Sequence, residues 1–312
     1  MNEADFIAAL RALATDPAAR GLLDDAAVLP AGGDLVLTHD MLAEGVHFLP
    51  GDPAADVAWK LLAVNLSDLA GKGAAPRGVL LGYMLRGDAE WDAAFLRGLG
   101  EALSAWDVPL LGGDTVACRG PRVLSLTAIG DAPPGGAPSR GGACADDDVW
   151  VSGTIGDAGV GLRLAREDDG GDPLLLQRYR RPEPRLALGA AVASMVTAMM
   201  DVSDGLLIDL SRLAAASGIR AVVDMDALPL SPALLKSEGD GRGARLAAAT
   251  AGDDYELLLT APRDAAELLT GAAKAAGVPL TRIGRVEAGG GLAIFQGCDA
   301  VALPDRLGYV HG

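Results

Sequence analysis

The chain has 312 residues, which is enough for two domains of ordinary size. Half of the residues are hydrophobic and only 4% are aromatic, so we expect a packed core built mainly from Ala, Val and Leu. The 26 Lys and Arg residues stand against 42 Asp and Glu residues, a formal net charge of −16. A surface of this sign repels nucleic acid and anionic membranes, so we expect neither as a partner.

The first half of the chain alternates helical and extended patterns. Residues 3–14 place Phe6, Leu10 and Leu13 at helical spacing and predict an opening helix. The elements expected after it, in chain order, are strands at Ala26–Leu29 and Leu35–Thr38, a helix at 54–70, a strand at Arg77–Leu85, a helix at Glu90–Trp106 and a strand at Val123–Ile129.

Residues 131–148 are rich in Pro and Gly and lack apolar periodicity, which is typical of a domain boundary. We therefore expect an N-terminal domain at 1–135 and a C-terminal domain at 136–312. The second half predicts strands at Val149–Ser152, Met199–Val202, Ala221–Val223, Tyr255–Thr260, Arg282–Val286 and Leu292–Phe295, with helices between them. The predicted fold class is mixed α/β, with mixed rather than purely parallel sheets flanked by helices.

The three cysteines, Cys118, Cys144 and Cys298, are widely spaced and form no CxxC pair. This pattern is not typical of a zinc site or a disulfide framework, and it favours a reducing, cytoplasmic location with the cysteines as small core residues. The acidic N-terminus is unlike a signal peptide, and the uncharged run Leu186–Met200 is too short to span a bilayer. That run predicts a buried helix that leads into a strand.

Several aspartates end an apolar strand or begin a glycine turn. They are Asp24, Asp25, Asp40, Asp68, Asp114, Asp201 and Asp204. Any one of them could cap a helix or close a turn, as Asp204 before a helical segment illustrates. Their number, without His or Cys clusters nearby, favours hard-oxygen ligands for Mg²⁺.

Glycines occur where a backbone could approach a phosphate group, at Gly112–Gly113, Gly153–Gly161 and Gly252. Each of these segments alone is a weak signal, and an ordinary turn is the simpler explanation of each. The P-loop pattern and the protein-kinase signatures are absent from the sequence, so a phosphoryl-transfer enzyme would need another fold. Arg140 and His47 lie beside such segments as a candidate phosphate contact and a candidate polar contact.

Taken together, these segments resemble the thiamine-monophosphate kinase family of the aminoimidazole-ribonucleotide-synthetase-like superfamily. The resemblance covers nearly the whole chain and is carried by DDAAVL, THDMLAEGVHF, VNLSDLAGKGA, LGGDT, VSGTIGDAGVGL, RRPEPRLALG, DVSDGLLIDL, AGDDYELLLT and GYVHG, in this order. It implies two domains, a homodimer whose N-terminal domains share a β-barrel, and ATP-dependent phosphorylation of thiamine monophosphate to thiamine diphosphate.

The resemblance also implies roles for individual positions. Metal ligands would be Asp25, Thr38, His39, Asp40, Asp68, Asp114, Asp201 and Asp204, with several Mg²⁺ ions, and His39 acting through its backbone if at all. Nucleotide contacts would be Gly113, Asp114, Arg140 and Ser203, and acceptor contacts would be His47, Asp253 and Tyr309. No residue is assigned as a general base, because the acceptor phosphate is already largely ionised.

Three positions depart from the family pattern. The second residue of a Ser/Thr pair is His39, the Glu of a GGED motif is Asp253, and a nucleotide-contacting aromatic is replaced by Leu96. Two alternatives also stay open at this point: another ATP-dependent enzyme of the same superfamily, or a non-catalytic nucleotide-binding dimer. The set of aspartates weighs against the second, because a binding module needs fewer metal ligands.

Overall fold

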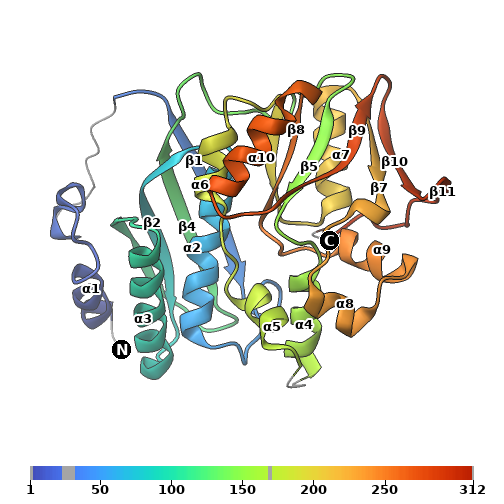
Figure 1. The fold of residues 1–312 in the computed structure, drawn as a ribbon. Helices are drawn as coiled ribbons and strands as arrows, with labels where there is room; N and C mark the ends of the chain where they lie inside the picture. The colour runs from blue at the N-terminus through green and yellow to red at the C-terminus, as the bar shows by residue number, and fades with distance from the viewer. Residues whose placement is uncertain (1–2, 23–31, 168–170, 311–312) are drawn as a thin grey trace. The chain divides into compact units, whose positions relative to one another are not determined.

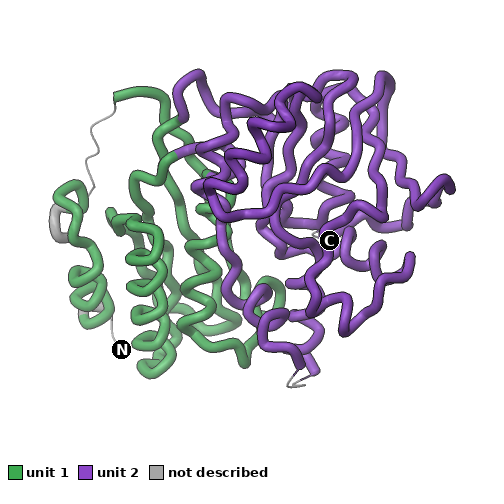
Figure 2. The backbone as a smooth tube through the Cα atoms, viewed as in Figure 1, with its two compact units in different colours: residues 1–69, 75–132 green, residues 70–74, 133–312 purple. Residues whose placement is uncertain are grey.

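The computed structural model describes residues 3–22, 32–167 and 171–310, and it divides the chain into two compact units. The first unit is 1–69 with 75–132, and the second is 70–74 with 133–312 (Figure 2). The short segment 70–74 therefore belongs to the second unit, although the chain on both sides of it belongs to the first. The expected strand Ala26–Leu29 and the candidate ligand Asp25 lie outside the described residues.

The first unit contains a four-stranded mixed sheet with helices on one face (Figure 1). Its strand order is β1-β4-β2-β3, antiparallel except for the parallel pair β2–β3. Its elements are α1 (Glu3–Arg11), a 3-10 helix (Pro17–Leu22), β1 (Leu35–Ala43), α2 (Ala54–Ala70), β2 (Ala75–Leu85), α3 (Ala89–Ala105), β3 (Leu110–Ala117) and β4 (Val123–Asp131).

Strand β1 shows how the two faces of this sheet differ. Successive side chains point to opposite faces, and the side chain of Leu42 is 2% exposed whereas those of Leu37 and Met41 are 64% and 51% exposed. Helices α2 and α3 cover the buried face, where Leu66 of α2 and Phe95 of α3 are fully buried. The other face carries large apolar side chains that are exposed among the described residues, such as Leu37 and Met41.

The second unit contains a seven-stranded mixed sheet in the order β11-β10-β7-β9-β5-β8-β6, in which only β10–β7 is parallel among the described pairs. Its strands are β5 (Asp148–Ser152), β6 (Ala198–Val202), β7 (Arg220–Asp224), β8 (Glu256–Ala261), β9 (Leu280–Glu287), β10 (Gly291–Gln296) and β11 (Asp299–Val301). Its helices are α4 (Asp157–Glu167), α5 (Pro173–Arg180), α6 (Leu186–Val192), α7 (Leu206–Ser217), α8 (Pro232–Glu238), α9 (Arg242–Thr250) and α10 (Ala266–Ala275), with 3-10 turns at Met225–Ala227 and Arg263–Ala265.

Alternating residues of this sheet pack in two hydrophobic clusters, one on each face. Val151 and Leu258 pack with α7 on one face, and Trp150 and Leu257 pack with α6 and α10 on the other. The central strands are buried on both faces, which is why they read as continuous apolar runs in the sequence.

The prediction of a mixed α/β fold with mixed sheets is confirmed. The prediction that the cysteines are core residues is wrong, because all three cysteines are exposed free thiols. Of the helices in the described part of the chain, none combines the length and apolar character needed to span a bilayer.

Candidate functional site

Three polypeptide segments meet at one end of the second unit's sheet. Asp201 lies in β6, and the turn that follows carries Ser203 and Asp204. The Asp253 N–H donates to the Ser203 carbonyl at 2.8 Å, and the Tyr309 N–H donates to the Asp204 carbonyl at 2.8 Å. The fold thus brings together five residues predicted for metal, nucleotide and acceptor binding from three distant parts of the sequence.

Glycines make this close approach possible. A Cβ atom at Gly252 would lie 2.8 Å from the Ser203 carbonyl oxygen, and one at Gly308 would lie 2.5 Å from the Asp204 carbonyl oxygen. Gly205 has φ +127°, a backbone conformation that other residues rarely adopt. These three glycines are therefore required by the packing of backbone on backbone at the site.

The turn after β6 is held by a buried carboxylate that the sequence did not indicate. Asp209 of α7 is fully buried and accepts hydrogen bonds from the Ser203 and Asp204 N–H groups at 3.1 and 3.0 Å. Arg212 contacts both Asp204, at 2.5 Å, and Asp209, at 2.7 Å. Burial raises the pKa of Asp209, and the nearby guanidinium opposes that rise.

The segment around Asp253 has an unusual backbone. Asp253 has φ +70° and Tyr255 has φ +51°, both in the left-handed region. The Tyr255 hydroxyl donates to an Asp253 carboxylate oxygen at 3.0 Å. Such conformations in residues other than glycine cost free energy and concentrate at functional sites, which agrees with the predicted acceptor role of Asp253.

In the first unit, Thr38, Asp40 and Asp68 lie close to one another. The Thr38 hydroxyl donates to the Asp68 carboxylate, and the Asp40 N–H donates to the side-chain oxygen of Asn65 at 3.0 Å. Asn65 and Asp68 both belong to α2, which lies over β1. Oxygen atoms from one strand and one helix are thus gathered on the buried face of the sheet.

His39 stands on the opposite face of β1 from Thr38 and Asp40. Its ring Nδ1 lies 2.8 Å from the hydroxyl of Thr127, its register partner on β4, and the side chain is exposed. The imidazole therefore does not join the oxygen atoms around Asp68. This position leaves the backbone of His39, rather than its ring, as the candidate ligand.

Gly113 and Asp114 lie in β3, with β4 and β2 between them and β1. Three strand spacings separate β1 from β3, about 14 Å at the usual distance between neighbouring strands. The exposed Asp114 carboxylate accepts from the Thr115 N–H at 2.9 Å, and a Cβ at Gly113 would lie 1.9 Å from the Leu81 carbonyl oxygen. The strand order of one chain therefore does not bring Asp114 to Asp40 and Asp68.

The two remaining predicted contacts lie in turns. His47 Nδ1 accepts from the Ala43 N–H at 3.0 Å, and its carbonyl accepts from Lys60 Nζ at 3.0 Å. Arg140 has an exposed side chain, and its carbonyl accepts from the Ser217 hydroxyl at 3.1 Å. The His47 ring is therefore held against its own turn, whereas the exposed Arg140 side chain extends from a backbone held by Ser217.

The predicted residues are divided between the two units. Those in the first unit are Thr38, His39, Asp40, His47, Asp68, Gly113 and Asp114, and those in the second are Arg140, Asp201, Ser203, Asp204, Asp253 and Tyr309. Among the described residues, no three His, Cys, Asp or Glu side chains are arranged so that they could hold a metal ion by themselves. Any metal bound by the described residues would therefore draw on other oxygen atoms, such as hydroxyl groups, backbone carbonyls or substrate phosphates.

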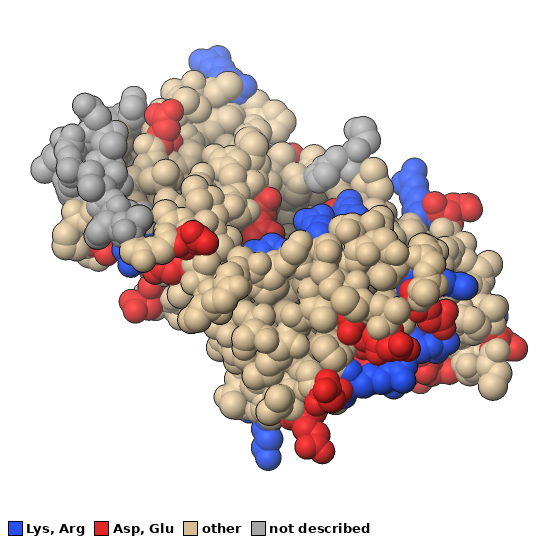
Figure 3. Space-filling model, turned by 90° about the horizontal axis from the view of Figure 1, so that it is seen from above, with Lys and Arg blue, Asp and Glu red and all other residues tan. Residues whose placement is uncertain are grey.

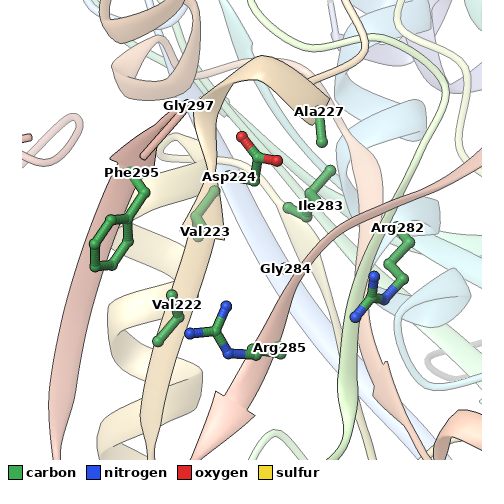
Figure 4. Close-up of a pocket in the computed structure, with 10 residues that line it drawn as sticks. All are labelled: Val222, Val223, Asp224, Ala227, Arg282, Ile283, Gly284, Arg285, Phe295 and Gly297. Carbon is green, nitrogen blue, oxygen red and sulfur yellow. The ribbon is translucent and has the colours of Figure 1, made fainter. Parts of the chain in front are cut away.

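A separate pocket of about 300 Å³ lies over β7, β9 and β10 and contains none of the predicted residues (Figure 4). Arg282 and Arg285 line it beside Val222 and Phe295. Arg282 forms an ion pair with Asp148 at 2.7 Å, and Arg285 forms one with Glu287 at 2.7 Å. Seen from above, the surface likewise shows acidic and basic side chains next to one another (Figure 3).

Both units match family models of known proteins. Residues 23–132 match the family model "AIR synthase related protein, N-terminal domain", and residues 145–296 match "AIR synthase related protein, C-terminal domain". The thiamine-monophosphate kinase of Caulobacter vibrioides is 46% identical over 323 aligned residues, which cover 100% of this chain and 91% of that protein.

Solved structures agree with the sequence relatives. The crystal structure of thiamine-monophosphate kinase from Stenotrophomonas maltophilia has a TM-score of 0.84 and 42% identity, and covers 95% of this chain and 96% of that one. A structure described as AaThiL complexed with AMPPCP and TMP has a TM-score of 0.77 and 30% identity, and covers 92% of this chain and 91% of that one. The order of motifs, the paired domains and the full-length relatives lead to one conclusion: this chain belongs to the thiamine-monophosphate kinase family.

Proposed function

We propose that this chain transfers the γ-phosphoryl group of ATP to thiamine monophosphate, giving thiamine diphosphate and ADP. The observation that carries the proposal is the 46% identity to the Caulobacter vibrioides kinase over the whole length of this chain. The motif segments that meet around Ser203, Asp253 and Tyr309 support it, because nucleotide and acceptor must lie close together for transfer.

The chemistry forms one bond and breaks one. A phosphate oxygen of thiamine monophosphate attacks the γ-phosphorus of ATP in line, a new P–O–P anhydride forms, and the bond to the β-phosphate oxygen breaks to release ADP. The attacking oxygen is already largely ionised at neutral pH, with a second pKa near about 6. The protein therefore needs no strong general base, and its task is to position the two substrates and balance their charge.

Residues of both units have roles in this proposal. Gly113, Asp114, Arg140 and Ser203 contact the nucleotide, and His47, Asp253 and Tyr309 contact the acceptor. The absence of a Cβ at Gly113 and Gly252 lets the backbone there pack against the carbonyl oxygens of Leu81 and Ser203, which fixes the position of each segment. The exposed guanidinium of Arg140 suits a phosphate partner.

The donor atoms fit Mg²⁺. Thr38, Asp40 and Asp68 offer hydroxyl and carboxylate oxygens on one face of the first unit, and Asp201, 6% exposed, is a carboxylate at the end of a buried strand. Hard oxygens of this kind suit Mg²⁺, which also takes substrate phosphates as ligands. When bound, the metal supplies positive charge that offsets the repulsion between two phosphorylated substrates.

We also propose a homodimer formed through the open face of the first unit's sheet. Leu35, Leu37 and Met41 on β1 and Val116 on β3 are large apolar side chains that are 38–64% exposed in the single chain. Large apolar side chains exposed on a sheet are typical of an interface, and a second copy of this face would bury them. This is also the face that a shared β-barrel between N-terminal domains would use.

A cytoplasmic location fits the cysteines. Cys118, Cys144 and Cys298 are all exposed and unpaired, and exposed thiols persist where the medium is reducing. The formal net charge of −16 agrees with the absence of nucleic-acid and membrane partners from the proposal.

The test is a coupled assay of purified protein with ATP, Mg²⁺ and thiamine monophosphate, with product mass measured alongside ADP release. We expect thiamine diphosphate and ADP in equal amounts, and loss of turnover on addition of EDTA. Asp68→Asn, which keeps the volume of the side chain, should lower turnover at least a hundredfold without unfolding the protein. Phosphorylation of free thiamine, or ADP release with no acceptor product, would show that the proposal is wrong.

A further inference from the structure

The two acidic residues that follow the proposed acceptor contact both have defined partners within the second unit. Both carboxylate oxygens of Asp254 accept from the Gly156 N–H, at 2.9 and 3.0 Å. Glu256, which is 2% exposed, receives two hydrogen bonds from Arg185, at 2.7 and 2.5 Å. Neither residue is used by the proposed chemistry, so the hydrogen bonds of Asp254 and the burial of Glu256 need another explanation.

The glycine-rich loop 153–156 is built around these two carboxylates. Gly153 has φ +57°, and a Cβ there would lie 1.9 Å from a Glu256 carboxylate oxygen. Gly156 has φ +89°, and a Cβ there would lie 2.5 Å from the Cβ of Ala248. The loop leads directly into α4, so the Gly156 N–H that donates to the Asp254 carboxylate lies immediately before the first residue of a helix.

The Arg185–Glu256 pair is anchored in the sheet. The hydroxyl of Ser152, the last residue of β5, donates to Glu256 at 2.5 Å and accepts from the Leu257 N–H at 2.8 Å. A bidentate arginine–carboxylate pair with a third hydrogen bond has a well-defined geometry. The pair therefore fixes the start of β8, and with it the end of the Asp253 turn.

The turn is held from its other side by main-chain hydrogen bonds. The Asp253 N–H donates to the Ser203 carbonyl, and the Tyr255 N–H donates to the Val202 carbonyl, each at 2.8 Å. Main-chain bonds thus hold residues 253 and 255, and the side chain of Asp254 between them reaches the glycine loop. Without that side-chain bond, the left-handed conformation at Asp253 would lose one of its restraints.

We propose that Asp254 is a positioning residue for acceptor binding: it ties the turn that carries Asp253 to the glycine loop at Gly156, with the Arg185–Glu256 pair as its support. The proposal rests on the proposed function, in which Asp253 contacts the acceptor. Asp254 acts through Asp253, because both of its oxygens are already directed at Gly156. Its effect should therefore fall on acceptor binding and not on nucleotide binding.

The test compares Michaelis constants for the two substrates in Asp254→Ala and Asp254→Asn. We expect Asp254→Ala to raise the KM for thiamine monophosphate at least tenfold, with the KM for ATP within twofold of wild type. Asp254→Asn keeps an oxygen that can accept from the Gly156 N–H, so it should recover most of the acceptor affinity. Gly156→Ala disturbs the other end of the same contact and should reproduce the effect of Asp254→Ala.

Combining the variants sharpens the test. If the two residues act through one contact, Asp254→Ala and Gly156→Ala together should raise the acceptor KM little more than either alone. Asp224→Ala is the matched control, because Asp224 also accepts from a main-chain N–H at the start of a helical turn, at 3.0 Å, but away from this site. Both Michaelis constants should be unchanged in the control.

Each outcome has a defined meaning. An acceptor KM within twofold of wild type in Asp254→Ala, or an equal rise in both Michaelis constants, would overturn the positioning role. If Asp254→Ala does not fold, Gly156→Ala decides by the same criteria, and an acceptor KM in Asp254→Asn as high as in Gly156→Ala would contradict the expected recovery. The wild type is measured first: failure to convert thiamine monophosphate would overturn the proposed function, whereas wild-type turnover with an unaffected variant overturns the positioning role alone.

Discussion

Asp253 has a backbone conformation that restricts which residue can stand there. At φ +70° the Cβ of an ordinary residue crowds the following carbonyl, and Asp and Asn tolerate this better than most residues because their short side chains bond locally. Here that local bond comes from the Tyr255 hydroxyl. The aspartate in place of the glutamate expected from the family pattern thus suits the backbone of this turn.

Substitutions at position 253 distinguish the effect of side-chain length from the effect of backbone strain. Asp253→Glu extends the carboxylate by roughly 1.5 Å, one C–C bond, and should keep the acceptor KM within threefold while lowering the melting temperature. Asp253→Ala should raise the acceptor KM at least tenfold and leave the ATP KM unchanged. Steady-state kinetics with thermal melts measure both effects, and an unchanged acceptor KM in the alanine variant would remove Asp253 from the acceptor site.

The charge of Asp254 should make stability depend on pH. Burial raises the pKa of its carboxyl well above the usual value, and the negative charges of Asp157, Glu256 and Asp253 act in the same direction, against the Gly156 hydrogen bond. The folded carboxyl binds its proton more tightly than the unfolded one, so this contribution favours folding at low pH. It is lost as pH rises from about 4, the usual carboxyl pKa, through the raised folded value.

Asp254→Asn carries no charge at any pH and therefore escapes this loss. We expect the melting temperature of the variant, relative to wild type, to rise between pH 4 and pH 8. Calorimetry in buffers of matched ionic strength measures the difference. A relative melting temperature that stays constant or falls over this range would contradict the assignment.

The helices and strands differed in how well the sequence predicted them. Helix α2 has the predicted bounds because its apolar residues repeat at helical spacing over 17 residues. Strand β3 was missed, because Gly112, Gly113 and Asp114 interrupt the alternation and disfavour strands. Helix α5 was missed although its signals were present, namely Asp172 as an N-cap and Pro173 in the first turn.

The residues of the candidate site could likewise be predicted from the sequence only in part. Aspartates at strand ends stood out because a charge there needs a partner. The partners themselves, Arg212 for Asp204 and Arg185 for Glu256, were not predicted, because tertiary contacts over 8 and 71 residues have no periodic signal. The separation of Asp114 from Asp40 likewise depends on strand order, which the sequence of one strand does not specify.

The Arg185–Glu256 pair should be important for stability. Arg185→Met leaves a buried carboxylate without its cation, which should destabilise the fold by about 3–5 kcal/mol. Adding Glu256→Gln removes the unpaired charge and should restore part of the loss. Urea unfolding measures both variants, and Arg285→Met, which breaks an exposed pair with Glu287, should cost no more than about 1 kcal/mol. A similar loss in both arginine variants would contradict this view.

The proposed homodimer can be tested by measuring the mass of the whole molecule in solution. Light scattering should give a mass near twice 31.6 kDa for the wild type. Leu37→Glu with Met41→Glu should shift the protein to a monomer, because charges would be buried in the apolar contact. Leu268→Glu is the control, since Leu268 is 63% exposed on α10 in the other unit. A monomeric wild type, or a dimeric double variant, would rule out this interface.

Segment 70–74 has a consequence for how the protein can be divided. Lys72 Nζ donates to the carbonyls of Pro138 and Met199, at 3.2 and 3.1 Å, and a Cβ at Gly71 would lie 3.0 Å from the Asp201 nitrogen. The second unit thus contains five residues encoded inside the first. A gene cut at residue 132 would yield a C-terminal fragment that lacks these contacts beneath Asp201. The two units are therefore not exchangeable modules. Neither unit could be inherited or transplanted as one uninterrupted stretch of sequence.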